Sequence, residues 1–84
     1  MSEHQGDAVS LVQGIVISLV DEPDEVKIES SQDDDTLIIE VHVAPGDVGK
    51  VIGRQGRIIK SIRTLARAAS SFAGGSRIEV EVVD

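Results

Sequence analysis

The chain has 84 residues, of which 40% are hydrophobic and none is cysteine. This size allows one small domain, and the lack of cysteine excludes a disulfide framework, a thiolate metal site and a cysteine nucleophile. The net charge of −7 at pH 7 disfavours nucleic acid only as an average: residues 1–49 hold 12 acidic residues and one basic residue (−11), whereas residues 50–84 hold seven basic and three acidic residues (+4). Phosphate binding responds to local potential, so the basic second half is the first functional indication.

Residues 1–7 are polar and acidic, and we expect them to form a tail before a single domain at residues 8–84. They lack the basic start and apolar run of a signal peptide. The longest apolar stretch, residues 11–20, is shorter than the roughly 20 residues that cross a bilayer. We therefore expect a soluble, cytoplasmic protein. Because so small a core is marginal, self-association is also a reasonable expectation.

Residues 8–20 are predicted to form the first helix, with Asp7 as its N-cap. Apolar residues recur along it at helical spacing, namely Val9, Val12, Val16 and Leu19. Many of its residues are β-branched, so a buried strand is the alternative, but the length of the run favours a helix that Pro23 ends.

A hairpin is predicted next. Residues 26–29 alternate apolar and polar side chains, residues 30–35 form a polar, acidic turn, and residues 36–43 are the clearest strand of the chain. The residues on the apolar face of this second strand are Leu37, Ile39, Val41 and Val43. Asp33-Asp34-Asp35 is interpreted as a solvated turn, because three consecutive carboxylates cannot all point towards one cation.

Two helices interrupted by glycines are predicted after Pro45. Asp47 is expected to cap a short helix at residues 48–52, and a longer helix follows from Arg57 to Phe72. The apolar stripe of the longer helix is expected to comprise Ile58, Ile62, Leu65, Ala66 and Ala69, with Phe72 in the core. Gly74-Gly75 ends this helix, and residues 78–82 alternate as a last strand. The predicted order is α-β-β-α-α-β.

Gly53-Arg54-Gln55-Gly56 is the most informative segment. Glycine at both ends lets the backbone turn sharply and approach a phosphate closely, and the following helix directs its N-terminal N–H groups to the same place. Lys50 and Arg57 flank the segment, and Lys60, Arg63 and Arg67 fall within about a 60° sector of the following helix. Glycine pairs and basic stripes are each common without function, but their adjacency in an otherwise acidic chain favours RNA binding.

The segment Val51-Ile52-Gly53-Arg54-Gln55-Gly56-Arg57-Ile58-Ile59 resembles the V-I-G-x-x-G-x-x-I signature of KH domains. The element order is similar to the type II arrangement, and residues 44–50 and 62–64 resemble the small stand-alone bacterial KH proteins of the KhpA type. The resemblance extends from about Ala8 to Val83. It implies an α+β fold in which a three-stranded sheet carries the helices on one face.

The resemblance also implies a cleft that grips about four nucleotides of single-stranded RNA. Together with the basic pattern, it predicts RNA contacts from Lys50, Gly53, Arg54, Gln55, Gly56, Arg57, Lys60, Arg63 and Arg67, with groove support from Val51, Ile52 and Ile59. The family further implies an RNA chaperone or post-transcriptional regulator that acts as a homodimer, or as a heterodimer with a larger KH-containing (Jag-type) protein.

Two other classes of function remain as alternatives. A protein–protein dimerisation module could use the first helix, where Ile15 and Ile17 would test the interface. An enzyme is disfavoured, because no Ser-His-Asp arrangement is recognisable. No cofactor or metal is expected, since His4 lies in the tail and His42 lies beside Glu40 without a third ligand at a recognisable spacing.

Overall fold

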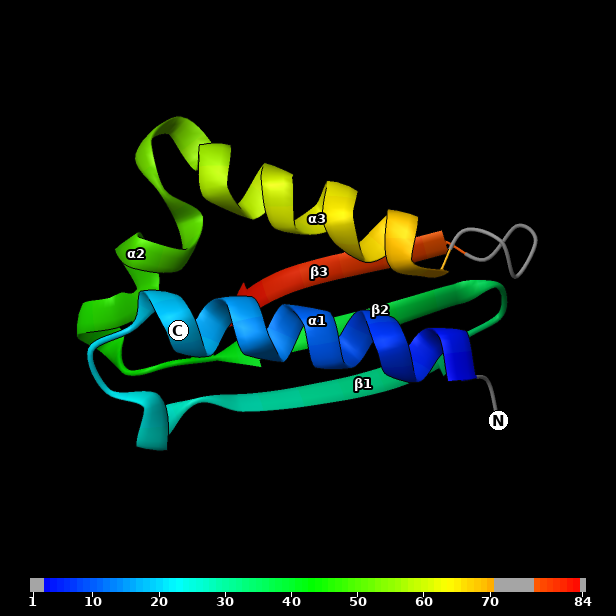
Figure 1. The fold of residues 1–84 in the computed structure, drawn as a ribbon, viewed down its shortest axis with the longest axis horizontal. Helices are drawn as coiled ribbons and strands as arrows, with labels where there is room; N and C mark the ends of the chain where they lie inside the picture. Colours follow the sequence, from blue (N-terminus) through cyan, green and yellow to red (C-terminus); the bar gives the residue numbers. More distant parts are fainter. Residues whose placement is uncertain (1–2, 71–76, 84) are drawn as a thin grey trace.

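The computed structural model describes residues 3–70 and 77–83 (Figure 1). The elements are α1 (Glu3–Leu19), β1 (Lys27–Asp33), β2 (Thr36–His42), α2 (Val48–Ile52), α3 (Arg57–Ser70) and β3 (Arg77–Val83). This order confirms the predicted α-β-β-α-α-β arrangement. The predictions made for Phe72 and for Gly74-Gly75 lie outside the described residues.

Within the described ranges, no helix is both long and apolar enough to span a membrane.

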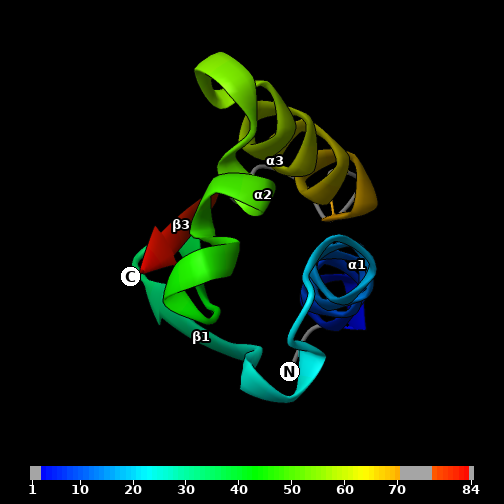
Figure 2. The ribbon, with the colours of Figure 1, turned by 90° about the vertical axis from the view of Figure 1, so that its left-hand side faces the viewer.

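In the described residues the sheet has the order β1-β2-β3, with β2 antiparallel to β1 and parallel to β3. The helices cover one face of this sheet, as the end-on view makes plain (Figure 2). Side chains alternate between the two faces of each strand. The inward residues of β2 and β3 are buried, namely Leu37, Ile39, Val41, Ile78 and Val80. The α+β architecture inferred from the sequence is therefore confirmed.

The core forms where α1 and α3 lie side by side over the sheet (Figure 1). The α1 residues in the core are Ala8, Val12 and Val16, which are fully buried. They are four residues apart, and this spacing places side chains on one face of a helix. The α3 residues in the core are Ile59, Ile62 and Ala66. The helical interpretation of residues 8–20 is thus correct, and the strand alternative is wrong.

The first helix begins at Glu3, earlier than the predicted start at Ala8. Asp7 therefore lies inside α1 and does not occupy its N-cap. Nothing in residues 3–7 stops a helix, because the segment has no proline and contains Glu3 and Gln5, which favour helix. Once the face from Ala8 to Val16 is packed, extending the helix backwards costs little.

The first strand extends to Asp33, so residues 30–33 pair with β2 and the prediction that places them in a turn is wrong. Each residue of β1 has a partner on β2, from Lys27 opposite His42 to Asp33 opposite Thr36. Because β1 is an edge strand, its second half is exposed on both faces and shows no apolar alternation. The turn shrinks to two residues, and Asp34 adopts a positive φ of 54°, a conformation that aspartate tolerates.

Leu65 was predicted to lie on the core stripe of α3, but its surface is 48% exposed. Successive residues of a helix are separated by about 100°, which places Leu65 about 60° from Ile62 and about 100° from Ala66. The centre of the buried stripe falls at Ile62 and Ala66, so Leu65 lies on its margin. The sequence pattern therefore predicted a wider buried stripe on α3 than the structure has.

Candidate nucleic-acid interface

The turn between α2 and α3 is built on positive backbone angles. Gly53 has φ 77° and ψ 171°, Gln55 has φ 58°, and Gly56 has φ 73°. The angles of Gly53 are accessible essentially to glycine alone. A Cβ on Gly53 would also lie 2.5 Å from Ile58 Cγ1, whereas one on Gly56 would meet Ile59 Cγ2 at an ordinary 3.9 Å. Glycine relieves backbone strain at both positions, and at Gly53 it also avoids a clash with Ile58.

Two backbone hydrogen bonds close this turn, and two further backbone N–H groups in it have no backbone acceptor. The Gly53 N–H donates to the Gly49 carbonyl at 2.8 Å, and the Gly56 N–H donates to the Gly53 carbonyl at 3.1 Å. Among the described residues, the backbone N–H groups of Arg54 and Gln55 donate to no backbone carbonyl. Two adjacent free N–H groups at an exposed turn can bind an anion such as a phosphate oxygen.

Exposed cations lie at the turn and along α3 beyond it. Arg54, Arg57, Lys60 and Arg67 are exposed, and none forms an ion pair with another residue of the described part of the chain. The Arg57 guanidinium donates to Gln55 Oε1 at 3.2 Å, which connects the start of α3 to the turn. The turn and the exposed edge of α3 therefore form a surface that carries cations without a described ion-pair partner.

Arg63 differs from the other cations because it is half-buried and bound to the sheet. Its Nε donates to the Val80 carbonyl on β3 at 3.3 Å. Arg63 and Arg67 line a depression between α3 and β3, together with Val80, Glu79 and Glu81. The strand side of this depression carries carboxylates, which repel phosphate, so an anion is attracted to the helix side only.

The residues predicted to support the groove lie beneath this surface. Val51 and Ile59 are buried in the core, and Ile52 is half-buried. Val51 and Ile59 thus hold α2 and α3 against the sheet on either side of the turn, and their side chains offer little surface to a ligand.

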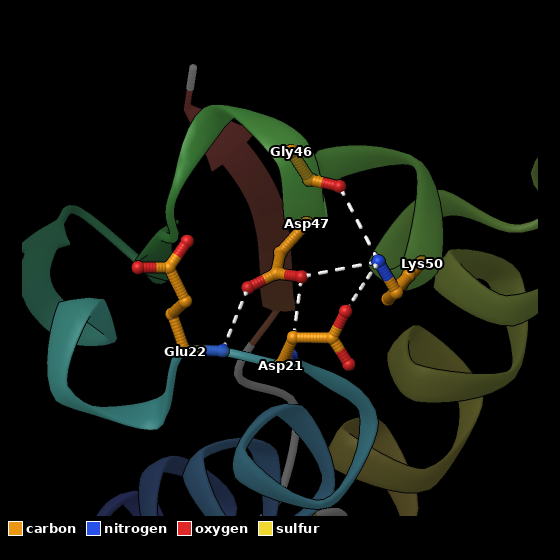
Figure 3. Close-up of polar contacts among 5 residues, drawn as sticks. All are labelled: Asp21, Glu22, Gly46, Asp47 and Lys50. Carbon is orange, nitrogen blue, oxygen red and sulfur yellow. Dashed lines mark hydrogen bonds and ion pairs between the residues drawn. The ribbon is translucent and has the colours of Figure 1, made fainter.

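The neighbouring loop contains a buried carboxylate that the sequence pattern did not identify. Asp47 is only 2% exposed, and its carboxylate accepts hydrogen bonds from the backbone N–H groups of Asp21 and Glu22, each at 3.1 Å (Figure 3). Asp47 occupies the N-cap position of α2 but makes no capping hydrogen bond. The predicted N-cap position of Asp47 is correct, but the predicted capping hydrogen bond is absent. The side chain instead joins the end of α1 to the start of α2.

Lys50 belongs to the same network. Its ammonium lies 3.2 Å from the Asp21 carboxylate, 3.3 Å from the Asp47 carboxylate and 3.5 Å from the Gly46 carbonyl (Figure 3). The contact with Asp21, followed by that with Asp47, raises the pKa of Lys50 above its ordinary value. The positive charge of Lys50 is therefore partly neutralised within the fold, unlike that of Arg54. The Asp47–Lys50 spacing of i, i+3 is the only local signal for this pair.

The same contacts stabilise the ionised form of Asp47. The hydrogen bond from the Asp21 N–H is the largest cause that lowers the pKa of Asp47; the Glu22 N–H and Lys50 act in the same direction, and burial opposes them. A buried carboxylate with several donors stays charged at neutral pH. The loop before α2, and with it the glycine turn, is thus anchored by an ionic contact to the end of α1.

A mixed sheet with helices on one face, and a G-x-x-G turn between two of those helices, together define a KH domain. A model of the KH domain of KhpA/KhpB matches residues 9–82, so the chain belongs to this family. Similar relatives include the RNA-binding protein KhpA of Borreliella burgdorferi, 42% identical over 79 residues that cover 94% of this chain and 95% of the relative. The RNA-binding protein KhpA of Clostridium acetobutylicum is 47% identical over 73 residues, covering 87% and 96% of the two chains.

The fold also occurs within larger proteins. A structure of Aquifex aeolicus Era bound to GDP.AlF4- aligns with a TM-score of 0.64 and 21% identity, covering 99% of this chain. A structure of Era in complex with MgGDPNP and nucleotides 1506–1542 of 16S ribosomal RNA aligns with a TM-score of 0.62 and 23% identity, covering 90% of this chain. The present chain spans about a third of these Era chains, 32% and 30% respectively. At this identity the likeness concerns the fold alone.

Proposed function

We propose that this protein binds short segments of single-stranded RNA at the G-x-x-G turn and along the basic edge of α3. One observation carries the proposal: two backbone N–H groups without a backbone acceptor, those of Arg54 and Gln55, lie beside cations that have no described ion-pair partner. The relatives named RNA-binding protein KhpA support the same assignment. The proposed role is binding, without catalysis or a cofactor.

In the proposed complex, the free N–H groups of the turn donate to oxygens of one phosphate. Arg54 and Arg57 supply positive charge at that phosphate, and Lys60 and Arg67 attract the phosphates that follow. Phe72 is the only aromatic residue of the chain, so stacking of bases on aromatic rings contributes little. Binding is then dominated by phosphate contacts, with modest affinity and strong dependence on salt.

The distribution of charge would orient the RNA. The acidic turn between β1 and β2 lies at the opposite end of the long axis from the turn between α2 and α3 (Figure 1). Repulsion from the acidic end and attraction at the basic end favour a single mode of approach. We further propose that the protein acts in the cytoplasm as an RNA chaperone or post-transcriptional regulator. It would act as a dimer, because two linked RNA sites raise the effective concentration of RNA at the second site.

A dimerisation module that pairs with a larger KH-containing protein of the Jag type is the second candidate. The observation that favours it is the exposure of two large apolar side chains on the helices, Ile17 at 42% and Leu65 at 48%. Such residues become buried in many protein–protein contacts. In this candidate the glycine turn would be secondary, and RNA affinity would not depend on it.

Replacing Arg54 and Gln55 together by aspartate is expected to lower RNA affinity more than 10-fold. The change places carboxylates at the proposed phosphate contact, and both positions are exposed, so the fold is retained. Aspartate also tolerates the positive φ of position 55. Fluorescence anisotropy with a labelled random pool of single-stranded RNA, at two salt concentrations, measures the loss, and circular dichroism verifies folding.

A matched control is the double variant Lys27→Asp, Gln32→Asp on β1. It changes the net charge by the same three units at exposed positions of the edge strand β1. We expect it to bind RNA nearly as well as the natural chain. If both double variants lose affinity equally, only net charge matters and the turn is not the contact. If the natural chain does not bind, or the turn variant binds normally, the dimerisation candidate takes precedence.

Neutralising Lys50 is expected to affect RNA binding less than neutralising Arg54. Each charge removed from a phosphate contact lowers the slope of log affinity against log salt by about 1. The ammonium of Lys50 already contacts Asp21 and Asp47. Arg54→Gln should therefore lower the slope, while Lys50→Gln leaves it nearly unchanged and lowers the melting temperature. Equal slopes for the two variants would place Lys50 on the RNA.

A further inference from the structure

Three potential metal ligands meet on the face of the sheet that the helices leave uncovered. Glu29 of β1 lies directly opposite Glu40 of β2 in the strand register. His42 lies two residues beyond Glu40, so it shares the same face. Sequence spacing offered no third ligand for His42 and Glu40, and the register of the hairpin now supplies Glu29. The third potential ligand is therefore visible only in the structure.

The distances suit a metal better than they suit hydrogen bonds. His42 Nε2 lies 3.3 Å from Glu29 Oε1 and 3.6 Å from Glu40 Oε1, and one ligand atom from each residue lies within 4.8 Å of the others. Tetrahedral zinc with bonds of about 2.0–2.1 Å separates neighbouring ligand atoms by about 3.3–3.4 Å. The two contacts of Nε2 lie close to this separation.

The imidazole nitrogen is also left without a hydrogen bond. His42 Nε2 is shielded from solvent and has no hydrogen-bond partner among the described residues, although two carboxylates lie beside it. Buried polar atoms are nearly always bonded. A nitrogen atom that is shielded from solvent and lies 3.3 Å and 3.6 Å from two carboxylate oxygens is placed to act as a metal ligand beside them.

A neighbouring lysine holds one of the two carboxylates in place. Lys27 Nζ contacts Glu29 Oε2 at 3.1 Å, which leaves the other oxygen of Glu29 directed towards His42. Ligating carboxylates are commonly oriented by such outer contacts. Two like charges directly opposite each other on adjacent strands are destabilising, and a bound cation would remove this cost. Glu29 and Glu40 also line an open depression with Ser30 and Ser31, so water can complete the coordination.

We propose that Glu29, Glu40 and His42 bind a divalent first-row transition-metal ion such as Zn²⁺. The ligands are one oxygen from each carboxylate and Nε2 of the imidazole, and water completes the coordination. The imidazole favours Zn²⁺ over Mg²⁺ and Ca²⁺, which prefer oxygen ligands. The ion connects the edge strand β1 to the central strand β2, so its binding stabilises the folded chain. The site lies on the other side of the sheet from the G-x-x-G turn, so it does not require RNA.

The test uses the full chain without added histidines, freed of metal by a chelator. Zn²⁺ alone is titrated by calorimetry, and Co²⁺ serves as a probe whose visible absorption reports tetrahedral coordination. We expect one ion per chain and a higher melting temperature with Zn²⁺. His42→Ala should abolish both effects, and Glu29→Gln and Glu40→Gln should each weaken binding at least 10-fold. The metal-free melting temperature of His42→Ala verifies that it folds.

His4→Ala is the matched control, because His4 is the only other histidine of the chain. We expect His4→Ala to bind Zn²⁺ like the natural chain. The proposal is overturned if His42→Ala retains the Zn²⁺ stoichiometry, if His4→Ala loses binding, or if Mg²⁺ competes equally with Zn²⁺. It is also overturned if the natural chain binds no Zn²⁺. RNA affinity measured on the same His42→Ala protein should be unchanged, which separates this site from the proposed RNA surface.

Discussion

Replacing Gly53 by alanine is expected to destabilise the protein by about 2–5 kcal/mol, a large fraction of the 5–15 kcal/mol that is typical of a folded domain. Two effects add. The backbone of Gly53, with φ 77° and ψ 171°, lies where a residue with a side chain is strained. The new Cβ would also lie 2.5 Å from Ile58 Cγ1 and 2.8 Å from Ile58 Cβ, so α3 would have to move relative to the turn.

The chain provides a graded series of glycines that separates these effects. Gly56 has φ 73°, but its added Cβ would make only an ordinary contact, so Gly56→Ala should cost about 1–2 kcal/mol from backbone strain alone. An added Cβ on Gly49 in α2 meets nothing within 4 Å, so Gly49→Ala should be neutral or stabilising by up to about 1 kcal/mol.

Urea denaturation of the three variants measures the free energies of unfolding. The expected order of destabilisation is Gly53→Ala, then Gly56→Ala, then Gly49→Ala. If Gly53→Ala and Gly56→Ala are equally destabilised, the contact with Ile58 does not contribute. RNA affinity measured where Gly53→Ala is still folded should also fall, because the displaced turn redirects the N–H groups of Arg54 and Gln55.

Replacing Asp47 by asparagine is expected to lower the melting temperature at pH 7 by about 5–15 °C. An asparagine side chain can accept one of the two hydrogen bonds from Asp21 and Glu22, but its amide group then meets the second backbone donor. The ion pair with Lys50 is lost as well. The loop before α2 would be released from the end of α1, and the G-x-x-G turn would lose part of its support.

The pH dependence of the melting temperature tests whether the charge of Asp47 causes this loss of stability. The pKa of Asp47 is lower in the folded protein than its ordinary value of 3.8, so ionised Asp47 stabilises the fold above that pH, and this contribution is lost as pH falls through the lowered pKa. Lys50 stays protonated over this range, because its pKa is raised above 10.5. The difference in melting temperature between the natural chain and Asp47→Asn should therefore be full at pH 7 and pH 5 and diminish towards pH 2.

The control for this series is Asp21→Asn. The Asp21 side chain is exposed and contacts only Lys50 among the described residues, so its replacement should change the melting temperature far less at every pH. A difference for Asp47→Asn that is the same at all pH values would contradict the ionic explanation. It would instead assign the effect to altered packing.

Local pattern was sufficient for the order of the elements and for the candidate RNA surface. The recurrence of Val9, Val12, Val16 and Leu19 at helical spacing identifies a helix, because neighbours along a helix face are set by its period. The alternation from Leu37 to Val43 identifies a strand in the same way. The glycines of the G-x-x-G turn are readable because their requirement is local to the backbone. The basic edge of α3 follows from residue spacing alone.

The remaining features depend on contacts between residues far apart in the chain. The second half of β1 is a strand because β2 pairs with it, although its own side chains show no apolar alternation. Leu65 is exposed because the position of α1 over the sheet decides which part of the α3 stripe is covered. Asp47 is buried by the end of α1, and Glu29 reaches His42 only through the register of the hairpin. The periodic elements and the glycine turn are predictable from the residues alone, because their signals repeat within a few residues. Strand pairing, helix exposure and polar partners follow from the folded structure, because they depend on which distant segments meet.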